Sequence, residues 1–131
     1  MVAHVRKPVV LLGIMALMFC GRIAAAQDLN SAIHLTRSEQ FSFAEREYKA
    51  LLQKSPDNGD IYFYYANNYL ARFFADSTII PYKEMADSAN MLFQKGVQAE
   101  PSNPLNFVGL MELALIDKDF IKANEIRDKA I

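Results

Sequence analysis

The chain has 131 residues, of which 14 are basic and 15 acidic, and 52% of its residues are hydrophobic. This composition fits one small folded domain, and a formal net charge of −1 gives no argument for nucleic acid or an anionic membrane surface as partner. A single cysteine, Cys20, excludes a disulfide framework within the chain.

The N-terminal 26 residues have the pattern of a secretory signal peptide. Arg6 and Lys7 precede an apolar run from Val9 to Cys20, and Ala24 to Ala26 supply the small residues typical of a cleavage site. The run is too short for a membrane span, which takes about 20 apolar residues. We therefore expect export to the periplasm or cell envelope, and no transmembrane span in the mature form.

The cleavage site has one alternative. Cys20, with Leu17 three residues before it, resembles a lipid-attachment site, but Phe19 is bulky where such sites carry Gly or Ala. We favour cleavage after Ala26 over lipid attachment. The mature domain would then span residues 27–131 and contain no cysteine.

Six segments after the signal carry apolar residues at helical spacing, separated by turn-forming clusters. The spacing predicts helices over residues 28–40, 41–54, 60–74, 82–99 and 105–116, and from 120 to the end. Ser55 to Gly59 and Glu100 to Pro104 stop the second and fourth helices. Every expected element is a helix, so the predicted fold class is all-α.

The six segments form three related pairs. Ala44, Tyr48 and Pro56 recur 45 residues later as Ala89, Phe93 and Pro101, whereas Ala32 and Ala66, like Ala89 and Ala123, are 34 residues apart. A period of about 34 residues indicates stacked repeats rather than one globular core. An insertion of 11 residues in the second repeat, around 75–85, reconciles the two spacings.

This pattern resembles the tetratricopeptide repeat (TPR). Repeat two carries the motif best, with Tyr62, Tyr65, Ala66, Tyr69, Ala89, Phe93, Gly96 and Pro101 in the family's places. Repeat one matches mainly in its second helix, and repeat three departs from the motif at Met111 and Arg127. The resemblance implies antiparallel helix–turn–helix repeats stacked as a short right-handed α-solenoid, at about 27–58, 59–103 and 104–131, the last incomplete.

In TPR proteins the first helices of the repeats line a concave groove that holds a segment of another protein. Carried over by position, the groove residues here are Leu29, Ile33, Thr36, Arg37, Phe63, Asn67, Leu70, Val108, Glu112 and Leu115. Phe63 and Phe74 share a helical stripe with two of them, which either lines the groove or contacts the next repeat. The resemblance implies an exported, non-catalytic scaffold that binds a protein or peptide of unknown identity.

Two alternatives stay open. The aromatic residues of segment 60–74 could stack on sugar rings, in a module that binds carbohydrate or the cell wall. The chain could also be the N-terminal, regulatory repeat region of a longer envelope protein. Ile131 lies inside an expected helix without a closing turn or capping helix, which stacked repeats need. We therefore expect further repeats or a partner to cover that edge.

The sequence contains no pattern for catalysis, a metal ion or a cofactor. His34 is the only histidine after the signal, so a zinc site would depend on carboxylates. Asp117 and Asp119 resemble the start of a calcium loop, but the glycine and terminal glutamate of that loop are missing. The glycines are scattered and form no phosphate-binding loop. We expect no enzymatic activity and no cofactor.

Small side chains are expected where paired helices cross, because larger ones would hold the backbones apart. Ala89 occupies such a place in repeat two. Ala89→Leu should overpack the crossing and lower the free energy of unfolding by about 1–3 kcal/mol. Thermal denaturation followed by circular dichroism measures this as a lower melting temperature, and an unchanged melting temperature would count against the repeat assignment.

Overall fold

The computed structural model describes residues 28–78 and 81–130, and every regular element in these ranges is an α-helix. A first helix covers residues 28–37, followed by α2 (Phe41–Lys54), α3 (Gly59–Ala75), α4 (Tyr82–Ala99), α5 (Pro104–Ile116) and α6 (Phe120–Lys129). The all-α prediction is confirmed. The expected signal peptide lies outside the described residues, and none of the helices described is long and apolar enough to cross a bilayer.

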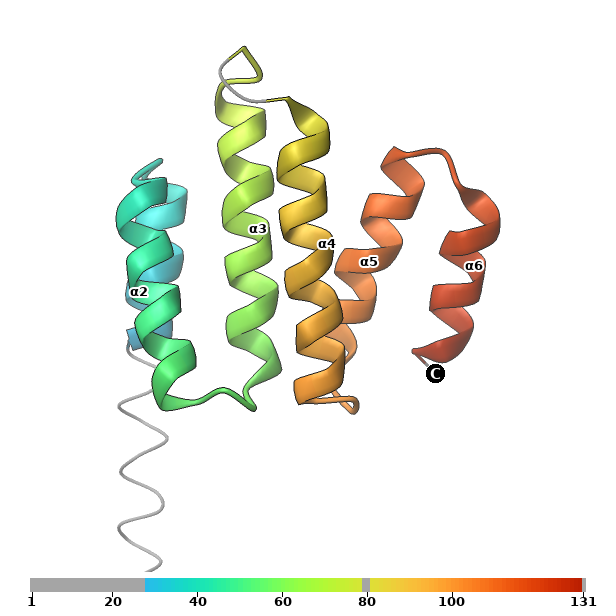
Figure 1. Ribbon diagram of the computed structural model, residues 1–131, viewed down its shortest axis with the longest axis horizontal. Coiled ribbons are helices and arrows are strands. Elements are labelled where there is room, and N and C mark those ends of the chain that lie inside the picture. The colour runs from blue at the N-terminus through green and yellow to red at the C-terminus, as the bar shows by residue number, and fades with distance from the viewer. Residues whose placement is uncertain (1–27, 79–80, 131) are drawn as a thin grey trace, which may run out of the picture.

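Helices α2 to α6 stand side by side in sequence order, and each runs opposite to its neighbour (Figure 1). Each packs against the next, and α3 also packs against α5. The contact between α3 and α5 joins the first helices of repeats two and three. A shared face of first helices is therefore available on one side of the molecule.

Small side chains lie at the centre of these helix contacts. The five alanines at the expected crossings are all buried: Ala32, Ala44, Ala66, Ala89 and Ala123. Gly109 of α5 lies so close to the ring of Phe93 on α4 that any side chain at 109 would overlap the ring. The close approach of α4 and α5 thus depends on a glycine at this position.

The turns between successive helix pairs recur at the 45-residue step seen in the sequence. The Asn58 side chain accepts a hydrogen bond from the backbone N–H of Asp60 at the start of α3 (3.0 Å), and Asn103 accepts one from Leu105 at the start of α5 (3.0 Å). These asparagines cap their helices by satisfying an N–H that has no partner within the helix. They are 45 residues apart, so two turns that far apart in the sequence have the same hydrogen-bonded geometry.

The turns within helix pairs also match. Glu39 and Lys118 have left-handed backbone angles, φ 59° and 60°, and the amide of the residue after each donates to a carbonyl five residues back. This is the Schellman arrangement, which ends a helix by reversing the chain. The prediction that the first helix reaches Gln40 is therefore wrong, since it ends at residue 37.

In repeat two the extra residues lie at the corresponding place, and none of the described residues there has left-handed backbone angles. Relative to the other repeats, α3 continues for four more residues (72–75), α4 begins four residues earlier (82–85), and the connection is three residues longer. These account for the 11 residues inferred from the spacing, although the first extra turn begins before residue 75. As a result α3 and α4 extend beyond their neighbours (Figure 1).

Glycine at position 39 should stabilise the first turn. A left-handed conformation costs a non-glycine residue about 1–2 kcal/mol, against about 0.5–1 kcal/mol for the extra entropy that glycine loses. We expect Glu39→Gly to raise the free energy of unfolding by about 0.5 kcal/mol in a denaturant titration. Glu47→Gly, at an exposed site within α2, is the control and should lower it by about 1 kcal/mol. If both variants lower the free energy of unfolding equally, residue 39 does not need a left-handed conformation.

Candidate functional site

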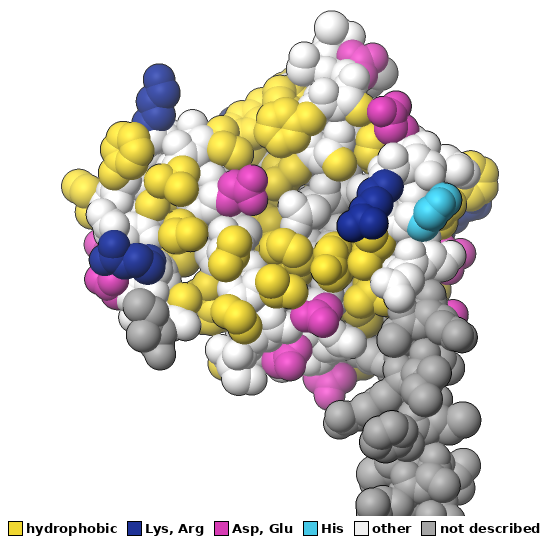
Figure 2. Space-filling model, turned by 180° about the vertical axis from the view of Figure 1, so that it is seen from behind, with side chains coloured by type: hydrophobic (Ala, Val, Ile, Leu, Met, Phe, Trp, Pro, Cys, Tyr) yellow, Lys and Arg dark blue, Asp and Glu magenta, His cyan; other side chains and the backbone are white. Residues whose placement is uncertain are grey.

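A groove opens among the first helix, α3 and α5. Its volume is about 380 Å³, and it is lined by Ile33, Thr36, Arg37, Tyr48, Phe63, Tyr64, Asn67, Leu70, Ala71, Phe74 and Glu112. This volume lies within the range of ligand-binding pockets, about 300–1,000 Å³. Seen from behind, the molecule has a face on which hydrophobic side chains gather across the middle, with few charged ones among them (Figure 2).

Most of the predicted groove residues come together here. Seven of the ten line the groove: Ile33, Thr36, Arg37, Phe63, Asn67, Leu70 and Glu112. The other three do not: Leu29 is half-buried against the main core, and Val108 and Leu115 are exposed outside the groove. Leu29 and Val108 occupy the place in their repeats that Phe63 has in repeat two, so only the middle repeat brings this position into the groove.

Three lining residues were missed by the sequence analysis. Ala71 follows Asn67 by four residues, so the helical stripe through Phe63 could have indicated it. Tyr64 lies beside that stripe rather than on it. Tyr48 belongs to α2, a second helix of its pair, and reaches the groove only because of how α2 packs.

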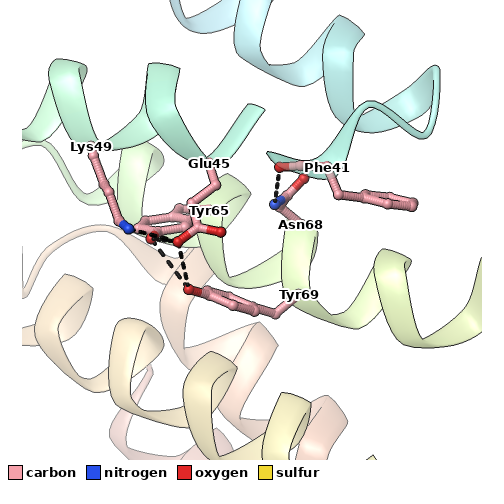
Figure 3. Close-up of polar contacts among 6 residues, drawn as sticks. All are labelled: Phe41, Glu45, Lys49, Tyr65, Asn68 and Tyr69. Carbon is pink, nitrogen blue, oxygen red and sulfur yellow. Dashed lines mark hydrogen bonds and ion pairs between the residues drawn. The ribbon is translucent and has the colours of Figure 1, made fainter. Parts of the chain in front are cut away.

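A polar network joins three helices at the groove. The Thr36 hydroxyl donates to Oδ1 of Asn68 (2.8 Å) and lies 3.2 Å from the hydroxyl of Tyr48. Nδ2 of Asn68 donates to the backbone carbonyl of Phe41 at the start of α2 (3.1 Å; Figure 3). Because Asn68 is buried, losing either partner would leave an unpaired polar group, at a cost of about 1–3 kcal/mol. The network therefore fixes the first helix and α2 against α3.

A second polar cluster ties α2 to α3. Oε1 of Glu45 accepts hydrogen bonds from the hydroxyls of Tyr65 (3.3 Å) and Tyr69 (3.2 Å) and pairs with Nζ of Lys49 (2.6 Å; Figure 3). The two tyrosine rings stack with centroids 5.4 Å apart, and Tyr65 stacks on Tyr48 at 5.5 Å. These contacts hold Tyr48 in position at the edge of the groove.

The electrostatics of the cluster favour an ionised Glu45. Burial works to raise the pKa of this carboxyl, but the hydrogen bond and charge of Lys49 and the two tyrosine hydroxyls outweigh it, so the net pKa is lowered. Burial, reinforced by Tyr69 and Glu45, raises the pKa of Tyr65. Tyr65 therefore stays a hydrogen-bond donor, and Glu45 stays an acceptor, at neutral pH.

Aromatic side chains form one wall of the groove. The Phe63 ring lies 5.9 Å from the centroid of Phe93, so Phe63 both faces the groove and contacts α4. Phe74 is 64% exposed, and its ring packs edge-on against Phe73 at 5.4 Å, which in turn packs against Tyr82 at 5.2 Å. Edge-on aromatic pairs of this kind are favourable, so Phe74 is held in place although it is exposed.

The one histidine after the expected signal and the acidic side chains do not gather into a metal site in the described residues. His34 is exposed and does not line the groove. Within residues 28–78 and 81–130, no three His, Cys, Asp or Glu side chains gather in a group that could hold a metal ion. A scan against models of known protein families and a search of curated proteins gave no match for the chain.

Removing the charge of Glu45 should weaken the link between α2 and α3 in a pH-dependent way. The folded pKa of Glu45 lies below its ordinary value of 4.5, so the unfolded chain takes up the proton first as the pH falls. The stabilisation is therefore complete well above pH 4.5 and is lost as the pH falls through the folded pKa. Glu45→Gln should cost about 1 kcal/mol at pH 7 and nearly nothing in strong acid.

Denaturant titrations of the wild type and Glu45→Gln across this pH range measure the difference. Glu47→Gln, at an exposed site on the same helix, is the matched control and should change stability little at any pH. A loss for Glu45→Gln that is as large in acid as at neutral pH would show that the ionised carboxylate has no special role.

Proposed function

We propose that the chain is a non-catalytic scaffold that binds a segment of another protein in the groove of its first helices. One observation carries the proposal: positions carried over from the resemblance to the TPR family converge on one open groove, with seven of ten among its lining residues. These positions lie on three helices that are far apart in the sequence. Their convergence on an apolar concave surface is typical of a binding site.

In this proposal the three helix pairs form a short right-handed α-solenoid of the TPR type. The recurrence of both turns supports it, since Asn58 and Asn103 cap equivalent helices and Glu39 and Lys118 end equivalent helices. The contact of α3 with α5 also supports it, because stacked repeats bring first helices together. The N-terminal signal pattern supports export to the periplasm or cell envelope.

A protein segment fits the groove better than a sugar does. Stacking on sugar rings would need at least two tyrosine faces open to solvent. Tyr48 and Tyr65 are buried, the other tyrosines among the described residues are half-buried, and the hydroxyls of Tyr65 and Tyr69 are bonded to Glu45. The aromatic residues that are mostly exposed are phenylalanines: Phe43, Phe74 and Phe120. Apolar rings of this kind suit the apolar side chains of a partner protein.

Truncating the aromatic wall should strongly reduce capture of the native partner. Phe63→Ala should reduce partner recovery from native envelope extracts about tenfold or more, because aromatic anchors dominate binding at such surfaces. Recovery is measured by affinity capture and quantitative mass spectrometry. Phe74→Ala, at an exposed site of the same wall, should act in the same direction without disturbing the core.

Phe43→Ala is the matched control for these variants. Phe43 is 55% exposed on α2, outside the groove, with the Arg46 guanidinium 4.6 Å from its ring centroid. The Phe43→Ala variant should leave recovery of the partner unchanged. If both wall variants fold normally by circular dichroism and still capture the partner as the wild type does, the groove is not the binding site.

A further inference from the structure

The insertion in repeat two adds an aromatic side chain to the lining of the groove. In repeats one and three the first helix ends at residues 37 and 116, which both correspond to residue 71 of repeat two. The extra turn of α3 carries Phe74, and Phe74 lines the groove. Without the insertion this turn would be missing, so the extra residues extend the apolar surface of the groove.

The groove also carries one charge of each sign. Among the described residues that line it, Arg37, at the end of the first helix, and Glu112, on α5, are the charged ones. Neither forms an ion pair with another residue of the described ranges. A segment that fills the groove well therefore presents apolar side chains with an acidic group on the Arg37 side and a basic group on the Glu112 side.

The same chain presents such a segment at α6. Phe120 and Ile121, at the start of α6, are 62% and 75% exposed, and exposed Asp119 and Lys122 flank them. Leu115 and Ile116 are exposed on the preceding helix. Among the described elements α6 packs only against α5, so its other sides are open. Contiguous exposed apolar side chains of this kind mark interaction surfaces.

We propose that the groove of one molecule binds the Asp119 to Lys122 segment of a second copy of the chain. Phe120 and Ile121 enter the apolar groove beside Phe74, Asp119 faces Arg37, and Lys122 faces Glu112. The inference rests on the groove being the binding site. Because groove and segment lie on different surfaces of one chain, the contact is head-to-tail, and it builds rings or open chains of molecules.

The interface predicted here is small, so the association is expected to be transient and to depend on concentration. Sedimentation equilibrium of the full chain over a wide concentration range should give a weight-average mass that rises above that of the monomer. Ile121→Ser removes the most exposed apolar side chain of the segment and should return the protein to a monomer. A wild type that stays monomeric at millimolar concentration overturns the proposal.

Charge reversal tests the pairing itself. Glu112→Lys places a base in the groove opposite Lys122, and Lys122→Glu places an acid on the segment opposite Glu112. Each variant alone should associate about tenfold more weakly than the wild type, because like charges then face each other. Mixing the two variants should restore association, since each groove then meets a segment of opposite charge. Lys95→Glu, at an exposed site on α4, is the control and should associate as the wild type does.

The results also separate this inference from the proposed function. If the variants weaken association but mixing does not restore it, another surface mediates the contact and the pairing is wrong. If the wild type is monomeric while an envelope protein is captured in a Phe63-dependent way, the groove binds a foreign segment and only the self-association is wrong. If neither self-association nor capture of an envelope protein is weakened by Phe63→Ala, the groove is not a binding site and the proposed function is wrong as well.

Discussion

The close approach of neighbouring helices is the constraint on which the rest of this structure depends. Buried alanines at five places in the helix contacts, and Gly109 against the ring of Phe93, let the helix backbones pack tightly. This packing sets the first helix, α3 and α5 near enough to share one concave surface. The large side chains then divide into those that fill the space between helices, such as Phe93, and those that face the groove, such as Phe74.

The polar clusters complement this packing by fixing orientation. Asn68 and Thr36 bind one another across the contact of the first helix and α3, and Glu45 binds Tyr65 and Tyr69 across the contact of α2 and α3. Apolar contacts alone would tolerate small rotations of these helices, whereas hydrogen bonds in a partly buried setting do not. The shape of the groove is therefore fixed by polar residues between the helices, most of which do not line the groove.

Regular spacing let the sequence indicate much of the architecture. Helix positions followed from apolar periodicity, and the stops at Ser55 to Gly59 and Glu100 to Pro104 from turn chemistry, and these bounds agree with the structure to within a few residues. The error at the end of the first helix has a local cause: Glu39 adopts a left-handed conformation that glycine favours, and its side chain gives no signal for a turn. The number of extra residues, 11, could be counted from the sequence. The sequence did not show that these residues form two extra helical turns and a longer connection.

The sequence by itself determined the helical class and the approximate bounds of the helices, because these depend on side-chain spacing along single helices. Most of the residues that line the groove were expected from the resemblance to the TPR family. Tertiary structure alone decided which repeats contribute to the groove. Leu29, Phe63 and Val108 hold the same place in three repeats, yet only Phe63 lines it. Tyr48 reaches the groove from a second helix for the same reason. The physical cause is that a concave surface arises from how helices pack against one another, and no periodicity within one helix encodes that geometry.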